Sequence, residues 1–216
     1  MINNNNDPGA ARHSPAAERN RQPIAQALLR LLPPQGVALE IASGSGQHVA
    51  HFAALMPGWS WLASDPDPQA LASIAAWWPT GPAPLRLDLL QGAWPLPPGH
   101  QALDAIYCAN LLHISPWTTC PALMQGAASH LVADGQLIVY GPFIVAGQVT
   151  APGNLAFDAD LRQRNPAWGL RALEDVQDEA LKAGLALNEC IAMPANNLLL
   201  VFKADAGAVK SSKDKT

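Results

Sequence analysis

The sequence predicts an α/β fold, in which a mostly parallel seven-stranded sheet has helices on both faces. Two observations lead to this prediction. Short apolar runs alternate with segments of helical periodicity, and the runs are almost continuously apolar, as in strands that are buried on both faces. At the end of the chain, only residues 194–196 separate two such runs. Because this connection is too short for a crossover, the last two strands should be antiparallel.

One domain is expected over residues 14–203, between flexible tails at 1–13 and 204–216. Ser14-Pro15 is a typical helix start, so residues 14–32 should form N-terminal cap helices. Residues 144–170 show little periodicity and are predicted to be a lid-like insertion. The other expected elements are strand 37–42, helix 46–56, strand 59–64, helix 68–78, strands 84–87 and 103–108, helix 120–131, strand 136–140, helix 171–183, and strands 185–193 and 197–203.

Composition excludes several classes of protein. The chain has 216 residues, of which 49% are apolar and 14% charged, and its net charge is −4. A fully disordered chain would be less apolar and more charged, and a nucleic-acid-binding domain would be basic. No apolar run approaches the ~20 residues of a membrane span, the N-terminus has no apolar signal segment, and the three cysteines stand alone. We therefore expect a cytoplasmic protein with neither nucleic-acid nor membrane partners.

The strongest motif is LEIASGSGQH, residues 39–48, which runs from a predicted strand into a predicted helix. Its glycines, Gly44 and Gly46, let the backbone turn sharply and come close to a ligand. The helix N-terminus that follows supplies free N–H groups. An NAD-dependent oxidoreductase would need a small third residue where Val49 stands, so the motif disfavours that alternative.

Acidic residues follow the next two predicted strands, Asp65 after the second and Asp88 at the end of the third. A carboxylate at Asp65 could accept hydrogen bonds from both ribose hydroxyls of a nucleoside cofactor. Either aspartate alone could be a turn residue, and Asp65-Pro66 is a typical turn opener. Because ligands of such sheets bind beyond the carboxyl ends of the strands, the glycine loop and these acids together favour a nucleoside site.

This pattern resembles the first motif of class I S-adenosylmethionine (SAM) methyltransferases, an acidic residue followed by glycines at every second position. Ala42 stands where that family usually has its first glycine, so the turn is expected to differ slightly. The resemblance implies SAM as the cofactor. The residues it implies around SAM are Glu40, Ala42, Gly44, Gly46, Asp65, Asp88 and Asn110.

Several stretches are also similar to a narrower family, the methyltransferase-like twenty-six family, whose bacterial members form a domain of unknown function. They span nearly the whole predicted core and imply the class I methyltransferase fold, but little about the substrate. The stretches are SPAAERNRQPI (14–24), LEIASGSGQHVAHFA (39–53), SDPD (64–67), CANLLHISPW (108–117), YGPF (140–143), FDADLRQRNPAWGLR (157–171) and MPANNLLLVF (193–202).

Two residues are candidates for catalysis. His113 follows the fourth strand, and an imidazole suits proton transfer near neutral pH; it could equally hydrogen-bond a neighbouring loop. Tyr140 ends the fifth strand and could orient a substrate or belong to the core. Asn110 is not followed by Pro-Pro-aromatic, which disfavours a nucleic-acid amino methyltransferase. His48 and His51 share a helix face but have no third ligand nearby in sequence, so no metal is expected.

Arginines gather in the N-terminal segment and in residues 162–171. We hypothesise that both segments cover the cofactor site and bind a small anionic substrate, since arginine pairs with carboxylate and phosphate. Tryptophan can hold a cation or stack on a planar group. The alternative is that the arginines pair with the chain's own acids and the tryptophans pack. The candidate residues are Arg19, Asn20, Trp117, Arg162 and Trp168.

The sequence therefore favours SAM-dependent methylation of a small molecule. Two alternatives stay open. One is a non-catalytic SAM-binding or partner-binding module with the same fold, and the other is a protein methyltransferase. The oligomeric state is left open.

Overall fold

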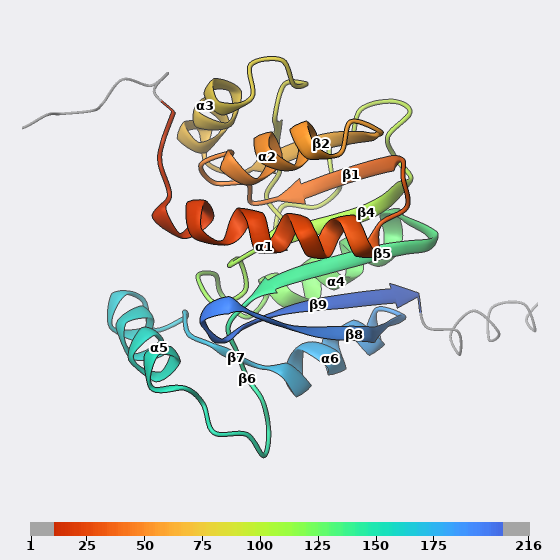
Figure 1. Cartoon of the computed structure of the whole chain (residues 1–216). Helices are drawn as coiled ribbons and strands as arrows, with labels where there is room; N and C mark the ends of the chain where they lie inside the picture. Colours follow the sequence, from red (N-terminus) through yellow and green to blue (C-terminus); the bar gives the residue numbers. More distant parts are fainter. Residues whose placement is uncertain (1–10, 205–216) are drawn as a thin grey trace, which may run out of the picture. The chain divides into compact units, whose positions relative to one another are not determined.

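The computed structural model describes residues 11–204 and has a mixed α/β architecture built on a seven-stranded sheet (Figure 1). The strand order is β3-β2-β1-β4-β5-β9-β8. The pairs β1–β2, β2–β3 and β4–β5 are parallel, whereas β5–β9 and β8–β9 are antiparallel. The predicted fold class is confirmed, including the antiparallel pair at the end of the chain.

Backbone contacts divide the described chain into two units, one of residues 11–88 and 94–101 and one of residues 89–93 and 102–204. The elements of the first unit are α1 (Pro15–Leu31), β1 (Gly36–Ile41), α2 (Gln47–Leu55), β2 (Trp59–Asp65), α3 (Pro68–Trp77) and β3 (Leu85–Arg86). The elements of the second are β4 (Leu103–Ala109), α4 (Thr119–His130), β5 (Leu131–Gly141), β6 (Phe143–Ile144), α5 (Pro152–Arg164), β7 (Arg171–Ala172), α6 (Leu173–Lys182), β8 (Leu185–Met193), the short 3-10 helix η1 (Pro194–Asn196) and β9 (Asn197–Ala204).

In the first unit, α1 packs on α2, and both α2 and α3 pack on β2. Helix α1 begins where its sequence predicts, because the Ser14 side chain accepts a hydrogen bond from the backbone N–H of Ala17. Its buried face carries Ile24 and Leu28, while Phe52 and Trp61 are buried on α2 and β2. Each such side chain stabilises the fold by roughly 1.5–3 kcal/mol, and this core fixes the loop between β1 and α2.

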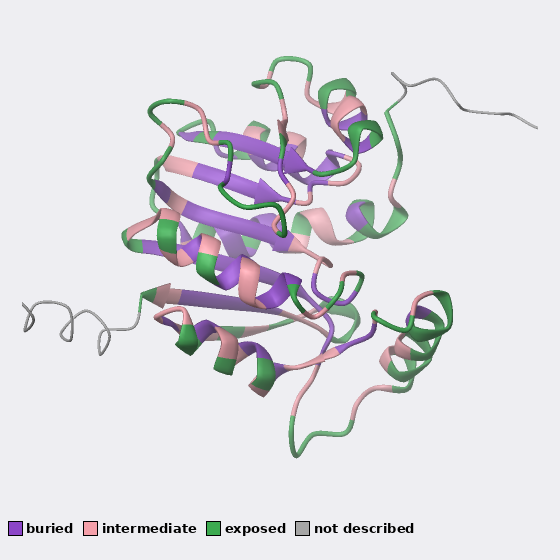
Figure 2. Cartoon of the chain, turned by 180° about the vertical axis from the view of Figure 1, so that it is seen from behind, coloured by how far each residue is buried: buried purple, intermediate pink, exposed green. Residues whose placement is uncertain are grey.

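In the second unit, α4 packs on β5 and α6 packs on β8. Figure 2 shows that the strands are largely buried, whereas the helices carry exposed residues on their outer sides. Two short strands, β6 and β7, pair in parallel outside the main sheet, with Phe143 opposite Arg171. This pair ties the chain that leaves β5 to the chain that enters α6.

Residues 144–170 differ from the expectation of little regular structure, because α5 occupies 152–164. Only Leu161 of this helix is buried, so no apolar periodicity marks it in the sequence. The fifth strand begins at Leu131, five residues before the expected start, and its pairing with β4 shifts register near that end.

Most of the two expected tails, residues 1–10 and 205–216, lies outside the described residues. Of the remainder, Arg12 is bonded to α3: its N–H donates to Ser73 Oγ at 2.8 Å, and its carbonyl accepts from Trp77 Nε1 at 2.6 Å. In the described part of the chain, no helix is both long and apolar enough to cross a bilayer.

Candidate functional site

The loop between β1 and α2 has left-handed backbone at three alternate positions. The φ values are 53° at Ala42, 57° at Gly44 and 89° at Gly46. A left-handed conformation costs a residue with a side chain roughly 1–2 kcal/mol, yet Ala42 adopts it. Ala42 thus adopts the positive φ of a glycine, although the alanine at this position leads us to expect a slightly different turn.

The two glycines of this loop have different structural roles. A β-carbon placed on Gly46 would lie 2.6 Å from Ile74 Cα in α3, so only glycine lets α3 pack this closely. A β-carbon on Gly44 would meet no atom within 4 Å. Gly44 therefore borders open space that a ligand can enter, whereas Gly46 serves helix packing.

Asp65 lies at the carboxyl end of β2, as predicted, and faces this loop. Its Oδ2 accepts a hydrogen bond from the Gly44 N–H at 2.9 Å, and its Oδ1 accepts one from the Asp67 N–H at 2.9 Å. The residue is only 7% exposed, and burial raises its pKa. Each oxygen keeps a second lone pair, so the carboxylate can accept further hydrogen bonds from a ligand.

Glu40 lies beneath the loop, buried at the end of β1. Its Oε2 has no hydrogen-bond partner in residues 11–204, and its Oε1 is 3.8 Å from His48 Nδ1. Burial raises the pKa of Glu40 to about 8 and lowers the pKa of His48 to about 4. Both side chains are therefore neutral near pH 7. His48 Nε2 lies 2.7 Å from Asn20 Oδ1, so α1 supports this pair.

The start of α1 is also bonded directly to the start of α2 through Gln47, which is 1% exposed. The Gln47 Oε1 accepts from the Ser14 N–H at 2.5 Å, and its Nε2 donates to Glu18 at 3.1 Å. Sequence reasoning does not identify Gln47, because nothing in its local pattern reveals partners about thirty residues away. The N-terminal segment therefore braces the helix that follows the glycine loop.

Asp88 lies two residues beyond the end of β3, rather than at the end of the strand as expected. It is half-buried. The neighbouring Leu87 N–H donates to the Asp65 carbonyl at 3.3 Å, which holds this segment against the end of β2. Within the first unit, the structure thus brings Glu40, the glycine loop, Asp65 and Asp88 to adjoining strand ends.

In the second unit, three candidate residues meet at the carboxyl ends of β4 and β5. The Asn110 N–H donates to the Tyr140 carbonyl at 2.8 Å, and Asn110 has a φ of 59°. The His113 ring packs closely on Gly141, where a β-carbon would lie 3.3 Å from the ring, a tight contact. Tyr140 and His113 are both buried.

The environment of His113 determines its charge. The residue is 4% exposed, and its ring meets that of Phe157 edge-on, with ring centroids 5.5 Å apart. Burial, helped by the positive charge of Arg171, lowers the pKa of His113 to about 4. The imidazole is therefore neutral near pH 7, so it can accept a proton but does not present a positive charge.

The two candidate tryptophans face the chain's own arginines. The Arg171 guanidinium lies 5.7 Å from the Trp117 ring, and that of Arg164 lies 5.4 Å from the Trp168 ring. Arg171 also donates to the Leu112 carbonyl at 2.9 Å. Two more of its bonds go to main-chain carbonyls at 115 and 167. The cations that lie over these two rings therefore belong to the chain itself. The hydrogen bonds of Arg171 also hold the loop that carries His113.

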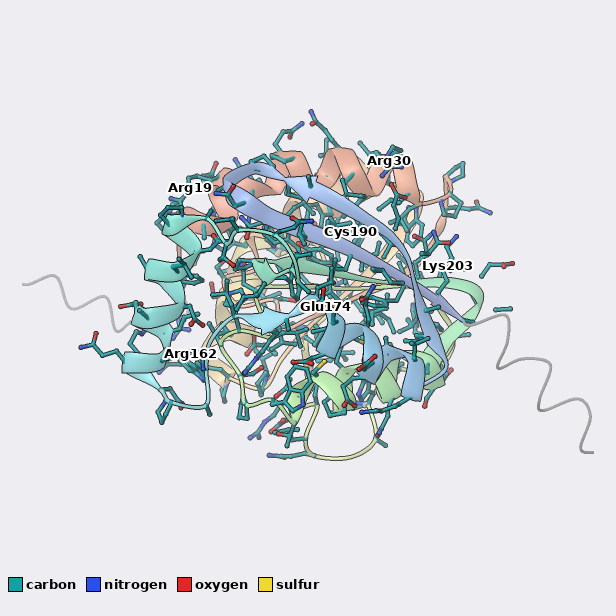
Figure 3. The ribbon with its side chains drawn as sticks, turned by 90° about the horizontal axis from the view of Figure 1, so that it is seen from below. Arg19, Arg30, Arg162, Glu174, Cys190 and Lys203 are labelled. Atoms are coloured by element: carbon teal, nitrogen blue, oxygen red, sulfur yellow. The ribbon has the colours of Figure 1, made fainter. Side chains whose placement is uncertain are left out.

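Internal ion pairs also account for other arginines of the two basic segments. Arg162 pairs with Asp158 at 2.8 Å and Arg21 with Glu18 at 2.5 Å. Figure 3 shows Arg162 on α5 and Arg19 on α1, where Arg19 is exposed. Arg162 thus pairs with an acid of the chain itself, which is the alternative to substrate binding, whereas Arg19 is exposed. Among the described residues, no group of three or more His, Cys, Asp or Glu side chains is placed to hold a metal ion.

Several solved structures of similar architecture are methyltransferases. CalO1, a methyltransferase in calicheamicin biosynthesis solved in its SAH-bound form, is 14% identical with a TM-score of 0.72, covering 88% of this chain and 54% of that one. Human N-acetylserotonin methyltransferase in complex with SAM is 15% identical with a TM-score of 0.71, covering 88% and 53%. An O-methyltransferase family 2 protein from Planctomyces limnophilus, in complex with apigenin, is 20% identical with a TM-score of 0.66, covering 87% and 61%.

At these identities the likeness shows the fold, which is the Rossmann-like fold of methyltransferases. The chain spans little more than half the length of the first two of these proteins. The model of the family described as protein of unknown function (DUF938) matches residues 11–204. The chain belongs to that family.

Proposed function

We propose that the protein is a SAM-dependent methyltransferase that acts on a small molecule. The observation that carries this proposal is the glycine loop bonded to Asp65. The loop offers open space at Gly44, and the carboxylate beside it keeps lone pairs for a ligand. This arrangement suits a nucleoside whose ribose hydroxyls need a carboxylate at a strand end.

The residues present fit SAM. Asp65 would accept the ribose hydroxyls, and the backbone at Gly44 would allow close approach. Glu40 has a buried oxygen without a partner among residues 11–204, and as a neutral acid it would hold the loop or reach the methionine amino group through water. When bound, SAM supplies an electrophilic methyl group on a sulfonium.

Positioning of the acceptor would provide much of the catalysis, because the transfer is an in-line displacement. His113 is our candidate for the base where the accepting atom carries a proton. Its imidazole is neutral near pH 7 and so has a lone pair that can accept the proton, but the burial that lowers its pKa also makes it a weaker base. Asn110 and Tyr140 share the same strand ends and are proposed to line the acceptor side.

The proteins of similar fold support a small-molecule substrate. One is a methyltransferase in calicheamicin biosynthesis, one was solved in complex with apigenin, and one is human N-acetylserotonin methyltransferase. The three cysteines are free in the structure, which agrees with the reducing cytoplasm that we propose as the protein's location. The narrower resemblance to the methyltransferase-like twenty-six family is consistent with this assignment.

The test is transfer of a labelled methyl group. The full chain is incubated with SAM carrying a tritiated methyl, together with either the small-molecule fraction or the protein fraction of a cell extract. We expect label in the small-molecule fraction, and at least tenfold less with Asp65→Asn. Label in the protein fraction alone would favour a protein methyltransferase, and transfer to neither would favour the non-catalytic module.

A further inference from the structure

A pocket lies wholly within the second unit, and none of the residues that line it is assigned above. One of them, Leu198, pairs with Gly141, the neighbour of Tyr140. The pocket lies between the segment that follows β6, the first turn of α5 and the hairpin that joins β8 to β9. Its volume of about 250 Å³ is just below the ~300–1,000 Å³ typical of ligand sites. It suits a small organic molecule.

The polar lining of this pocket consists of uncharged groups. Four carboxamide side chains line it, those of Gln148, Asn154, Asn196 and Asn197. Among the described lining residues there is no Lys, Arg, His, Asp or Glu. A carboxamide offers both a donor and an acceptor, but it cannot offset the desolvation of a full charge. The lining therefore selects an uncharged ligand with hydrogen-bonding groups.

The rest of the lining is apolar. Phe143 forms part of the wall and is itself 7% exposed, and Met193 and Leu198 come from the hairpin. Val149, which also lines the pocket, is 98% exposed. An aromatic and aliphatic wall of this kind suits a flat apolar group, and a ligand in the pocket would cover part of Val149.

The hairpin is held in a strained shape where it meets the pocket. Ala195 and Asn196 both have left-handed backbone, with φ values of 57° and 54°. A left-handed backbone is uncommon for residues that carry a side chain, and such positions gather at ligand clamps. Asn154 on α5 donates to the Asn196 carbonyl at 3.0 Å, and Asn197 donates to the Pro194 carbonyl at 3.0 Å. The Asn154 amide thus holds the hairpin against α5, and the Asn197 amide holds the turn of the hairpin itself.

We infer that this pocket binds the substrate, and that the substrate is an uncharged small molecule with a flat apolar part and amide, carbonyl or hydroxyl groups. The inference names the substrate class of the proposed methyltransferase and therefore rests on that proposed function. It departs from the anionic substrate that the arginine clusters suggest, because Arg162 and Arg164 are paired with acids of their own helix.

The test compares two probes of the same shape, para-hydroxybenzamide, which is uncharged, and para-hydroxybenzoate, which is an anion near neutral pH. Each is titrated into isotope-labelled full-length protein while the side-chain amide signals of Asn154, Asn196 and Asn197 are followed by NMR. Single Asn→Asp variants assign these signals. We expect the amide probe to shift them saturably and to bind at least about tenfold more tightly than the benzoate.

Ala192 lines the pocket from an exposed position on β8, so Ala192→Trp should fill it and abolish the shifts. Asn188→Trp, at an exposed position of the same strand outside the lining, is the matched control and should leave them unchanged. The inference is overturned if neither probe binds, if both bind equally, or if Ala192→Trp has no effect.

A calorimetric titration of the same sample with SAM keeps the two proposals distinguishable. SAM binding without saturable shifts by the amide probe would overturn the pocket and leave the methyltransferase proposal standing. Shifts by the amide probe without SAM binding would overturn the methyltransferase proposal, and with it the identification of the bound molecule as a methyl acceptor.

Discussion

The backbone N–H of Gly44 donates a 2.9 Å hydrogen bond to Oδ2 of Asp65. This bond joins the loop after β1 to the carboxyl end of β2, two strands that pair in parallel. The carboxylate that we propose to hold the ribose therefore also sets the position of the loop. Changes at either residue should affect cofactor binding more than they affect the fold.

The two loop glycines should respond differently to the same substitution. Gly46→Ala places a β-carbon 2.6 Å from Ile74 Cα at a φ of 89°, so we expect a loss of about 3 kcal/mol in the free energy of unfolding. Gly44→Ala meets no atom within 4 Å and should cost about 1 kcal/mol while weakening SAM binding. Urea unfolding and calorimetry measure the two effects. Equal destabilisation by both changes would contradict these roles.

Glu40 should make the stability of the fold depend on pH. Burial raises its pKa in the folded state from 4.5 to about 8. Between these values the folded protein keeps a proton that the unfolded chain has released, so the free energy of unfolding should fall as pH rises through this range and level off above about 8. Glu40→Gln removes this dependence.

Urea unfolding of both proteins at several pH values measures the difference. The variant should gain stability relative to the wild type as pH rises toward 8. His48 contributes a pH dependence of opposite sign below its ordinary pKa, but it is present in both proteins. Curves that stay parallel across the range would show that Glu40 is ionised in the folded protein near neutral pH.

His113 should stay neutral over the physiological range. Burial lowers its pKa from 6.5 to about 4, so stability that depends on its neutral form is present above about pH 6.5 and is lost as pH falls through 4. NMR of the imidazole ring, assigned with His113→Gln, should show no titration between about pH 8 and pH 5.5. A midpoint near 6.5 would mean that the ring is solvated and would contradict the burial that lowers its pKa.

Asp158 should hold the C-terminal end of α5. Its carboxylate accepts from Arg162 Nε at 2.8 Å and from the Leu170 N–H at 2.7 Å. Asp158→Ala removes both bonds and should cost about 1–3 kcal/mol locally, which would speed tryptic cleavage at Arg162 and Arg164. Asp160→Ala removes only an exposed pair of 3.6 Å with Arg164 and should have little effect. Similar cleavage rates in the two variants would contradict this role.

The sequence predicts the sheet and the first part of the site well, for a physical reason. Strands buried on both faces form continuous apolar runs, so Asp65 could be placed at a strand end. Helix α5 is not predicted, because Leu161 is its only buried residue. The bonds of Gln47 and of Asn20 are not predicted either, since they join α1 to α2 through tertiary packing.

The pocket in the second unit could not be found from spacing. Its walls come from residues 143–154 and 192–198, which only the folded chain brings together. The one local signal is Asn196-Asn197 after Pro194-Ala195, since asparagine tolerates a left-handed backbone. That signal predicts a turn and says nothing of a ligand.

The central claim is that the glycine loop and Asp65 bind SAM, and calorimetric titration of the full chain with SAM tests it most directly. Asp67→Asn is the matched control, because asparagine also caps α3 and the change removes only an exposed pair with Arg12. We predict saturable binding by the wild type and by Asp67→Asn, and at least about tenfold weaker binding by Asp65→Asn. Absence of SAM binding by the folded wild type, or equal binding by Asp65→Asn, would contradict the claim.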